Sequence, residues 1–388
     1  MTPAPLGADL ARDAFLALNR LAYGGLLRPL IFRRSAQQAH HDMLRLLRRA
    51  DALAAALDPL LGAAHGLAFP RGTFHAGGVA LDSPLILAAG LVKGDGFPSE
   101  DTALAAVQSG ANIIPGWRSA PRLVGPVEFG SFTRWPRLGN PGTVVWRDIP
   151  TRSTQNRIGL RNPGARAAAA FLSARRDRLP PIYGINIAVS PGVEDVDQQT
   201  GEVLEALAAF VGAAIRPAWF TLNLSCPNTE DDPRGHQTAG EARQVCGAAV
   251  RALAGTGVPL WVKVGPDLSD DQYRGLMRIF AEVGVRAVIA TNTLPMPTPD
   301  DPAATAGVAG GRLHARAVAV AGLLAAERAA HDYPVDVIGC GGVQDGATYR
   351  AFARLGAPVV QYWTALVYRG PFAAALIAHE AGIDRRGE

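Results

Sequence analysis

Residues 260–290 read LWVKVGPDLSDDQYRGLMRIFAEVGVRAVIA, and they contain one complete unit of the pattern that runs through most of the chain. A short apolar run at Leu260–Val264 is followed by helical spacing of apolar residues over 269–283 and by a second apolar run at Ala287–Ala290. Short apolar runs on either side of a helical segment are typical of parallel strands joined by a helix. The stretch therefore predicts a strand–helix–strand unit.

The same alternation continues on both sides of this unit, from about residue 72 onward. The predicted strands are Leu85–Ala89, Val127–Ser131, Ile182–Ile187, Trp219–Leu224, Leu260–Val264, Ala287–Ala290, Val335–Gly339 and Val359–Gln361. The predicted helices are 99–109, 163–177, 201–215, 240–254, 269–283, 313–331, 345–355 and 371–381.

Eight strand–helix alternations predict an α/β fold, a (β/α)8 TIM barrel. One detail stays open around the second strand, because Asn112–Ile114 is also strand-like and 111–131 would then hold an insertion. A doubly wound open sheet is the alternative fold, and the absence of a GxGxxG motif at the first helix argues against it.

Residues 1–66 have a different pattern, and we interpret them as an N-terminal helical extension before a barrel over 67–388. Helices are expected over about 9–23 and from Ser35, which forms a capping-box pattern with Gln38, to Leu57. Leu26–Phe32 between them is very apolar for a linker. Eight arginines and five aspartates give the extension three of the chain's four net positive charges. It is either a cap packed on the barrel or an amphipathic helix pair lying on a membrane surface.

The composition excludes several classes of protein. With 48% apolar and 19% charged residues, the chain is expected to fold. It contains no uncharged apolar run long enough to span a bilayer and does not open with a secretory signal pattern. Three cysteines (Cys226, Cys246 and Cys340) in a chain of this length argue against a disulfide framework, and the lack of a CxxC pair argues against a zinc ribbon. The barrel has no basic stripe with interleaved aromatics, so no nucleic-acid partner is expected.

Lysine is nearly absent from the chain. Only two of the 38 basic side chains are lysines, Lys93 and Lys263, and both stand at the ends of predicted strands. A compact ammonium fits a narrow pocket that the wide guanidinium of arginine does not. We therefore expect both lysines to belong to a binding site, although a biased composition with chance survivors would also leave a few.

Asparagines stand with the two lysines at the predicted strand ends, where barrels of this class carry their chemistry. An amide both donates and accepts, which suits a flat ring with alternating C=O and N–H groups. The asparagines are Asn156, Asn186, Asn223, Asn228 and Asn292. Glycine pairs at Gly310-Gly311 and Gly341-Gly342 occupy positions where many barrels bind phosphate. A phosphate and a flat, amide-rich ring together indicate flavin mononucleotide (FMN).

Cys226 differs from the other two cysteines because it follows a predicted strand and precedes a proline in a polar loop. No histidine is close enough in sequence to suggest a thiolate–imidazole pair. We interpret Cys226 as a general base that removes a carbon-bound proton. Cys246 and Cys340 are expected to be inert core residues.

These residues resemble the dihydroorotate dehydrogenase family over nearly the whole chain. The most specific motif is Asn223–Thr229, and Thr291–Thr293 supports it. Val127–Thr133, followed by Gly139–Pro141, is also similar to the family. The extension, through Leu26–Phe32 and Ala39–His41, resembles that of the membrane-associated class that uses a quinone.

The resemblance implies an enzyme that oxidises dihydroorotate to orotate in pyrimidine biosynthesis. FMN would be held by Ala89, Gly90, Lys93, Ser131, Asn186, Asn223, Lys263, Thr291, Gly311, Gly341, Gly342, Trp363 and Thr364. Dihydroorotate or orotate would be held by Lys93, Asn156, Asn223, Asn228, Asn292 and Thr293. No metal is expected.

The resemblance also implies the roles of two catalytic groups. Cys226 would remove the proton from C5 while C6 gives a hydride to N5 of the flavin. Lys263 would stabilise the negative charge of reduced FMN. A quinone would reoxidise the flavin, and the protein would be peripheral on the cytoplasmic face of the inner (cell) membrane, with a cytoplasmic location as the alternative.

Four departures from the family keep other functions open. Cys226 replaces the serine usual in the quinone-using class, and Leu160 replaces an aromatic residue. Ala188–Pro191 replaces a lysine-bearing segment, and an acidic loop at 230–236 replaces a short basic one. The alternatives are an FMN oxidoreductase of another dihydropyrimidine or cyclic amide, and a catalytically silent barrel that binds a ligand.

Overall fold

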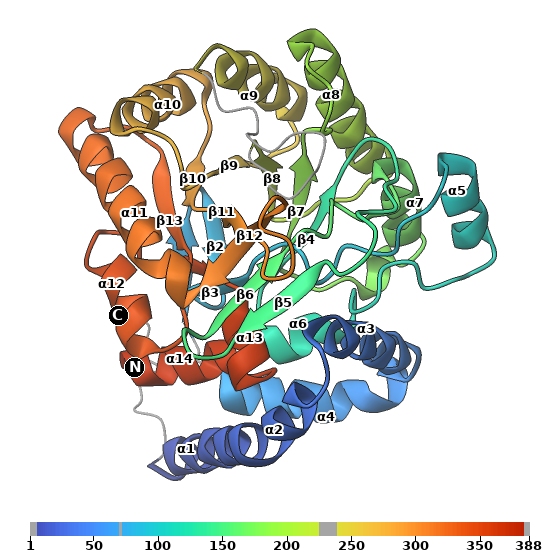
Figure 1. Ribbon diagram of the computed structural model, residues 1–388, viewed down its shortest axis with the longest axis vertical. Helices are drawn as coiled ribbons and strands as arrows, with labels where there is room; N and C mark the ends of the chain where they lie inside the picture. Colours follow the sequence, from blue (N-terminus) through green and yellow to red (C-terminus); the bar gives the residue numbers. More distant parts are fainter. Residues whose placement is uncertain (1–5, 70–71, 225–238, 384–388) are drawn as a thin grey trace.

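A closed barrel of eight strands forms the centre of the molecule in the computed structural model, which describes residues 6–69, 72–224 and 239–383 (Figure 1). The barrel strands, in the order in which they pair, are β3 (Leu85–Leu87), β4 (Val127–Phe132), β7 (Tyr183–Ala188), β8 (Trp219–Asn223), β9 (Leu260–Val264), β10 (Ala287–Ala290), β13 (Asp336–Cys340) and β14 (Val360–Tyr362). Strand β14 pairs with β3, and all eight pairings are parallel. The predicted (β/α)8 barrel is confirmed.

The helices that follow these strands form the outer ring. They are α5 (Glu100–Gln108), α6 (Ser119–Val124), α7 (Ala165–Ser173), α8 (Val196–Gly212), α9 (Ala239–Leu253), α10 (Asp270–Val283), α11 (Gly311–His331), α12 (Gly346–Ala353), α13 (Thr364–Arg369) and α14 (Ala373–Ala381). A short 3-10 helix covers Arg176–Arg178. Helix α10 shows why the unit at 260–290 folds as predicted. Ser269 caps its first turn by accepting from the Gln272 N–H, and Gly284 ends it at a φ of 87°.

Two details around these helices differ from the sequence prediction. Asn112–Ile114 is not a strand, and α6 occupies part of the segment between α5 and β4. Helix α8 begins at Val196 and not near residue 201, because the Asp195 carboxylate accepts the Gln198 N–H and caps an earlier turn.

The register of the barrel brings the polar strand ends together. Asn223 at the end of β8 pairs with Lys263 of β9 on one side and with Ala188 of β7 on the other. Ala290 of β10 stands opposite Val264 of β9. Because the strands are parallel, their carboxyl ends meet at one mouth of the barrel.

The amino end of the barrel is closed by a hairpin of β1 (Phe74–Ala76) and β2 (Val79–Leu81). Trp261 donates its indole N–H to the carbonyl of Gly77 at 3.1 Å. The Trp261 ring stacks on Trp219, with 4.5 Å between the ring centroids. This apolar plug leaves the carboxyl end as the accessible end of the barrel.

A second sheet, which the sequence analysis did not predict, lies at the carboxyl end. It is antiparallel, in the order β11 (Leu294–Pro297), β12 (Thr305–Gly310), β6 (Ser153–Asn156) and β5 (Val145–Asp148) (Figure 1). Strand β6 reads Ser-Thr-Gln-Asn and β12 consists mostly of small residues, so neither shows the apolar run by which the barrel strands were found.

The N-terminal extension consists, over its described length, of helices joined by short turns. It comprises α1 (Leu6–Leu21), a π-helical turn (Ala22–Leu27), α2 (Arg28–Phe32), α3 (Ala36–Ala52) and α4 (Ala54–Ala68). The Ser35–Gln38 capping box at the start of α3 is confirmed. Two expectations were wrong. Leu26–Phe32 continues the helix and is not a linker, and the expected second helix breaks at Leu53 and resumes as α4.

One face of the extension packs on the barrel. Leu16 and Leu47 are buried in the main core, and the Phe15 ring meets Phe372 of α14 edge to face, with 5.2 Å between centroids. The Tyr23 hydroxyl donates to the carbonyl of Val367 at 2.8 Å. The interpretation as a packed helical cap is therefore confirmed.

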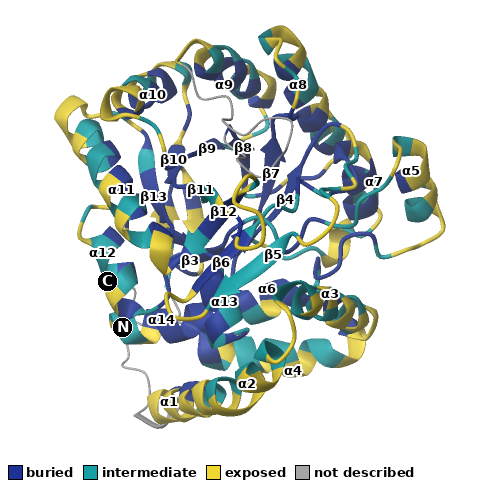
Figure 2. Cartoon of the chain, in the orientation of Figure 1, coloured by how far each residue is buried: buried dark blue, intermediate teal, exposed yellow. Residues whose placement is uncertain are grey.

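The opposite face of the extension exposes apolar side chains to solvent, and Figure 2 shows α1 largely in the colour of exposed residues. The exposed leucines are Leu10, Leu18, Leu21, Leu26, Leu27, Leu30, Leu46, Leu53 and Leu60. Across residues 6–69, 72–224 and 239–383, no helix has the length and apolar character needed to cross a bilayer.

Candidate active site at the carboxyl end of the barrel

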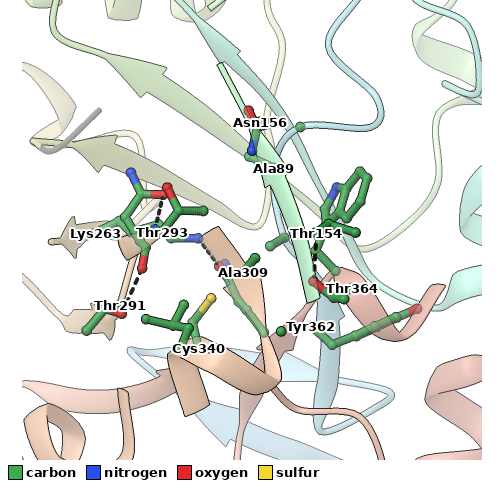
Figure 3. A pocket seen from close by; sticks show the side chains of 18 of the residues that line it. Ala89, Thr154, Asn156, Lys263, Thr291, Thr293, Ala309, Cys340, Tyr362 and Thr364 are labelled. Atoms are coloured by element: carbon green, nitrogen blue, oxygen red, sulfur yellow. Dashed lines mark hydrogen bonds between the residues drawn. The ribbon is translucent and has the colours of Figure 1, made fainter. Parts of the chain in front are cut away.

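A cavity lies at the carboxyl end of the barrel, between the strand ends and the antiparallel sheet. It holds about 1190 Å³ of space not filled by protein atoms, open solvent included. Figure 3 shows Lys263, Thr291 and Thr293 on one side of it and Thr154 and Thr364 on another. The hydroxyls of Thr154 and Thr364 lie 3.1 Å apart, so the second sheet and the barrel meet at the cavity wall.

The structure brings most of the predicted site residues to this one cavity. Its lining includes Ala89, Gly90, Lys93, Ser131, Asn156, Asn186, Asn223, Lys263, Thr291, Asn292, Thr293, Gly341, Gly342, Trp363 and Thr364. Gly311 stands behind the lining residue Gly310, and a Cβ on Gly311 would lie 2.1 Å from the carbonyl oxygen of Thr151. Cys226 and Asn228 lie outside the described residues.

The described side chains that line the cavity include positively charged groups and no negatively charged ones. Lys93 and Lys263 both line it and are buried, with 8% and 6% of their surface exposed. None of the described residues that line it is acidic. Such a lining favours a ligand with anionic groups.

Lys263 is held in place from below the cavity. Its ammonium donates to Oε1 of Gln361 at 3.0 Å. Burial raises the pKa of the Cys340 thiol, and the neighbouring Lys263 charge lowers it only in part. Burial also raises the pKa of Cys246 to about 12. Both thiols are therefore neutral at pH 7, which agrees with the prediction that they are inert, but Cys340 also lines the cavity.

Two buried polar atoms at the cavity have no partner within the described part of the chain. They are Oδ1 of Asn186 and Oγ1 of Thr293. Buried polar atoms in folded proteins are almost always hydrogen-bonded. Because both residues line the cavity, these atoms are available to a ligand with both donor and acceptor groups.

Glycines form another part of the cavity wall. Gly341 and Gly342 have φ values of 137° and 68°. A Cβ on Gly342 would lie 2.5 Å from Cβ of His314 and 2.6 Å from the Gly310 carbonyl oxygen, so only glycine fits there. Helix α11 begins beside this turn at Gly311. Exposed backbone N–H groups beside a helix N-terminus favour a phosphate.

Several lining residues were missed by the sequence analysis. They are His40, Ala88, Val145, Thr154, Gln155, Ile158, Gly159, Ala309, Leu313, Cys340, Val343, Gln361 and Tyr362. Val145, Thr154, Gln155 and Ala309 belong to the unpredicted antiparallel sheet. Gln361 is the last residue of the predicted strand Val359–Gln361, and a polar side chain after two valines was the sequence feature that could have indicated a site residue.

His40 extends the site into the N-terminal extension, because it lies on α3 and lines the cavity. Burial lowers the pKa of His40 to about 3, and the positive charges of Lys93, Arg161 and His41 act in the same direction. The imidazole is therefore neutral at pH 7. The extension contributes a side chain to the cavity as well as covering the barrel.

We expect acidification to destabilise the protein through His40. Its pKa in the folded state lies below its ordinary value near 6.5, so the unfolded chain takes up a proton that the folded one excludes as pH falls below about 6.5. Between pH 7 and pH 5 the free energy of unfolding should fall by about 1–2 kcal/mol more in the wild type than in His40→Gln. Urea unfolding at both pH values measures this difference.

The matched control for this experiment is His331→Gln, because the His331 side chain is 53% exposed at the end of α11. The control should keep the pH dependence of the wild type. Identical pH dependence in His40→Gln and the wild type would contradict the prediction.

The departures from the family fall in different places. Leu160 lines the cavity and has a φ of 52°, unusual for a residue with a side chain. Val189, within 188–191, packs in the core with 6% of its surface exposed, and none of 188–191 lines the cavity. The loop at 230–236 lies outside the described residues. Of the described departures, only Leu160 meets the cavity.

Comparisons with known proteins agree with this geometry. The family model for dihydroorotate dehydrogenase matches residues 76–382. A dihydroorotate dehydrogenase (quinone) from Leifsonia xyli is 36% identical over 261 residues, 65% of this chain and 73% of the relative. A dihydroorotate dehydrogenase (quinone) from Chromobacterium violaceum is 32% identical over 360 residues, 89% of this chain and 94% of the relative.

Solved structures extend the likeness to the fold. A crystal structure of DHODH from Eimeria tenella in complex with ferulenol superposes with a TM-score of 0.69. That likeness covers 90% of this chain and 93% of the other at 21% sequence identity. At this identity it supports the barrel and its helical extension.

Proposed function

Because the chain belongs to the dihydroorotate dehydrogenase family, we propose that it oxidises dihydroorotate to orotate and passes the electrons to a quinone. The observation that carries the proposal is the convergence of both lysines of the chain and four of the five predicted asparagines on one cavity whose described lining contains no acidic residue. Dihydroorotate is a cyclic imide with a carboxylate. It therefore offers amide edges to the asparagines and a negative charge to the lysines.

FMN is the cofactor that we assign to this cavity, and when bound it supplies the hydride acceptor. Two observations support the fit: the unpartnered atoms of Asn186 and Thr293, and the glycine turn at Gly341-Gly342 beside the start of α11. The residues proposed to hold it are Ala89, Gly90, Lys93, Ser131, Asn186, Asn223, Lys263, Thr291, Gly311, Gly341, Gly342, Trp363 and Thr364. Gly311 would contribute through the backbone at the helix start.

The substrate is proposed to lie against the amide side chains of the cavity. Asn292 donates to Oδ1 of Asn223 at 3.4 Å, and its own Oδ1 accepts the backbone N–H of Thr293 at 2.9 Å. This chain of bonds fixes the direction in which the amides face. The full proposed set is Lys93, Asn156, Asn223, Asn228, Asn292 and Thr293. Holding the ring by several such bonds aligns both reacting C–H bonds, which lowers the entropic part of the barrier.

Cys226 is the proposed base, and it follows the cavity residue Asn223 by three positions in sequence. It takes the proton from C5 as the hydride leaves C6, so one double bond forms in the ring and two electrons leave the substrate. Lys263, whose ammonium is held by Gln361 at the base of the cavity, opposes the negative charge that those electrons bring. Reduction of a quinone to a quinol then returns the protein to its starting state.

The quinone is proposed to arrive from a membrane on the side of the N-terminal extension. His40 of α3 lines the cavity, so the extension reaches the reaction site. The extension exposes leucines on the face turned away from the barrel, and residues 1–66 as a whole carry a net positive charge. A helical surface with these features favours an anionic bilayer. The protein would then be peripheral, on the cytoplasmic face of the inner (cell) membrane.

Polar substitution of the exposed face should weaken membrane binding. Leu18 and Leu21 are one helical turn apart on α1, with 65% and 68% of their surface exposed. Complete burial of a leucine is worth about 1.5–3 kcal/mol. Leu18→Gln/Leu21→Gln should therefore bind anionic vesicles at least about tenfold more weakly in a flotation assay.

The matched control substitutes Leu138, which is 61% exposed and lies outside the extension. Leu138→Gln should float with the vesicles as the wild type does. Undiminished binding of the α1 double variant would contradict the proposed membrane surface. Equal loss in both variants would also contradict it, because the extension would then have no special part in binding.

The proposed activity is tested by measuring orotate formation from dihydroorotate by the purified, FMN-loaded chain with a short-chain quinone. We expect orotate and quinol in equal amounts. No orotate with any quinone or dye would contradict the assignment. Turnover of a different dihydropyrimidine in the same assay would identify the alternative substrate class that Leu160 at the cavity wall leaves open.

A further inference from the structure

We propose that Glu128 is a positioning residue that sets which polar atoms face the cofactor cavity. The inference rests on the proposed FMN site. Glu128 lies on β4 inside the barrel, is 0% exposed and does not line the cavity itself. It acts through two amide side chains, Asn186 and Gln361, that do line the cavity.

Four side chains from three other strands donate to the Glu128 carboxylate. Its Oε1 accepts from Nδ2 of Asn186 at 2.5 Å. Its Oε2 accepts from Gln361 at 2.7 Å, from Thr221 at 2.9 Å and from the Trp219 indole at 3.1 Å. Both oxygens act only as acceptors, which matches an ionised carboxylate and leaves no choice of direction for the amide groups.

The first consequence concerns Asn186. An asparagine amide has a donor side and an acceptor side, and its orientation follows from its partners. Glu128 accepts the NH₂ group, so Oδ1 of Asn186 must point the other way. That oxygen is buried and unpartnered among the described residues, and it belongs to a residue of the cavity wall. Glu128 thereby presents a hydrogen-bond acceptor to the ligand.

The second consequence concerns Lys263. Gln361 gives its NH₂ group to Glu128, so its Oε1 is left to accept from the Lys263 ammonium at 3.0 Å. A negative and a positive buried group are thus joined through one amide. Buried charges are tolerated when they are paired and hydrogen-bonded. Glu128 therefore fixes the orientation of two amides: Asn186 presents an acceptor oxygen at the cavity wall, and Gln361 presents one to the Lys263 ammonium.

A purely structural role is the competing explanation, because Trp219 and Thr221 also bond Glu128 and do not line the cavity. The two roles differ in what a glutamine at this position does. Glutamine has nearly the same shape, but one side of its amide donates. Where that side faces Asn186, the asparagine must turn over and present a donor to the cavity in place of an acceptor.

The test measures FMN binding to the flavin-free full chain by fluorescence quenching. Glu128→Gln should raise the dissociation constant at least about tenfold, which corresponds to about 1.4 kcal/mol. Asn186→Asp alone should also bind poorly, because two carboxylates would face each other. The double variant Glu128→Gln/Asn186→Asp restores a donor–acceptor pair and an oxygen toward the cavity. It should return the dissociation constant to within about threefold of the wild type.

Thr221→Val is the matched control, because it removes one bond to the same carboxylate without touching either amide that faces the cavity. It should lower the melting temperature of the flavin-free chain and leave FMN affinity unchanged. Wild-type affinity in Glu128→Gln, or no rescue in the double variant, would overturn the inference. So would a control that weakens binding as much as Glu128→Gln does.

The two proposals fail in different ways in this experiment. A wild type that binds no FMN contradicts the cofactor assignment and, with it, the role given to Glu128. A wild type that binds FMN with the expected pattern of variants, and is not reduced by dihydroorotate, contradicts only the proposed reaction. Failure of both Glu128→Gln and the double variant to fold would assign Glu128 to structure alone.

Discussion

Lys263→Arg is expected to slow dihydroorotate oxidation by about a hundredfold to a thousandfold, the range found when one preorganised electrostatic group is lost from an active site. The Lys263 ammonium lies in a buried position on the floor of the cavity, 3.0 Å from Oε1 of Gln361. Arginine keeps the charge but brings a wide planar group that does not fit where a compact ammonium does. Anaerobic stopped-flow measurement of flavin reduction separates this step from quinone reduction.

The matched control for Lys263 is a basic exchange on the surface. Arg278 on α10 has a side chain that is 63% exposed. In Arg278→Lys, dihydroorotate should reduce the bound flavin at the wild-type rate. A wild-type rate in Lys263→Arg would show that positive charge alone suffices and would remove the geometric argument for lysine at this position.

Cys226→Ala is expected to lose turnover by about a hundredfold to ten-thousandfold while retaining FMN, because general bases contribute rate factors of this size. The proposed task of Cys226 is proton removal, and none of the cofactor contacts proposed above involves its side chain. Cys226→Ser should keep FMN and recover activity as pH rises, since a hydroxyl ionises at higher pH than a thiol. Flavin content and a pH profile of flavin reduction measure both expectations.

The control for Cys226 is Cys246→Ala. Cys246 is fully buried in α9, and burial raises the pKa of its thiol to about 12. Its loss should lower stability modestly and leave turnover unchanged. Undiminished turnover in Cys226→Ala would exclude Cys226 as the base and direct attention to another group of the cavity.

The barrel itself was predictable because its strands are buried on both faces. Continuous apolar runs such as Leu260–Val264 and Ala287–Ala290 stand out in the sequence, and capped helices such as α10 separate them. The predicted lysines and most of the predicted glycines and asparagines converge for the same reason. Parallel strands place their carboxyl ends at one mouth, so a strand assignment is also an assignment of the site.

The second sheet was not predictable from the same signal. Strand β6 is polar and pairs with the small residues of β12 through backbone hydrogen bonds. Neither strand therefore shows a regular spacing of apolar residues in the sequence. The residues that β6 brings to the cavity, among them Thr154 and Gln155, were missed with it. The expectation that 26–32 is a linker between two helices failed for a different reason. A proline at position 29 lies within the first turn of α2, where helices tolerate it.

The polar network beneath the cavity was also beyond sequence reasoning. Glu128 and Gln361 are 233 residues apart and stand in different strands, each as a polar residue among mainly apolar neighbours. Only the closure of the barrel between β14 and β3, next to β4, brings them within 2.7 Å. A glutamate within a predicted buried strand indicated that Glu128 needs polar partners. Those partners could be named only once the order of the strands around the barrel was known.

The central claim is that this cavity holds FMN and that dihydroorotate reduces it. The most direct measurement is the visible absorption spectrum of the purified chain, taken anaerobically while dihydroorotate is added without a quinone. The account predicts an oxidised flavin spectrum that bleaches with formation of one orotate per flavin. A flavin that dithionite bleaches and dihydroorotate leaves oxidised would contradict the assigned reaction, and a chain that takes up no FMN would contradict the assigned site.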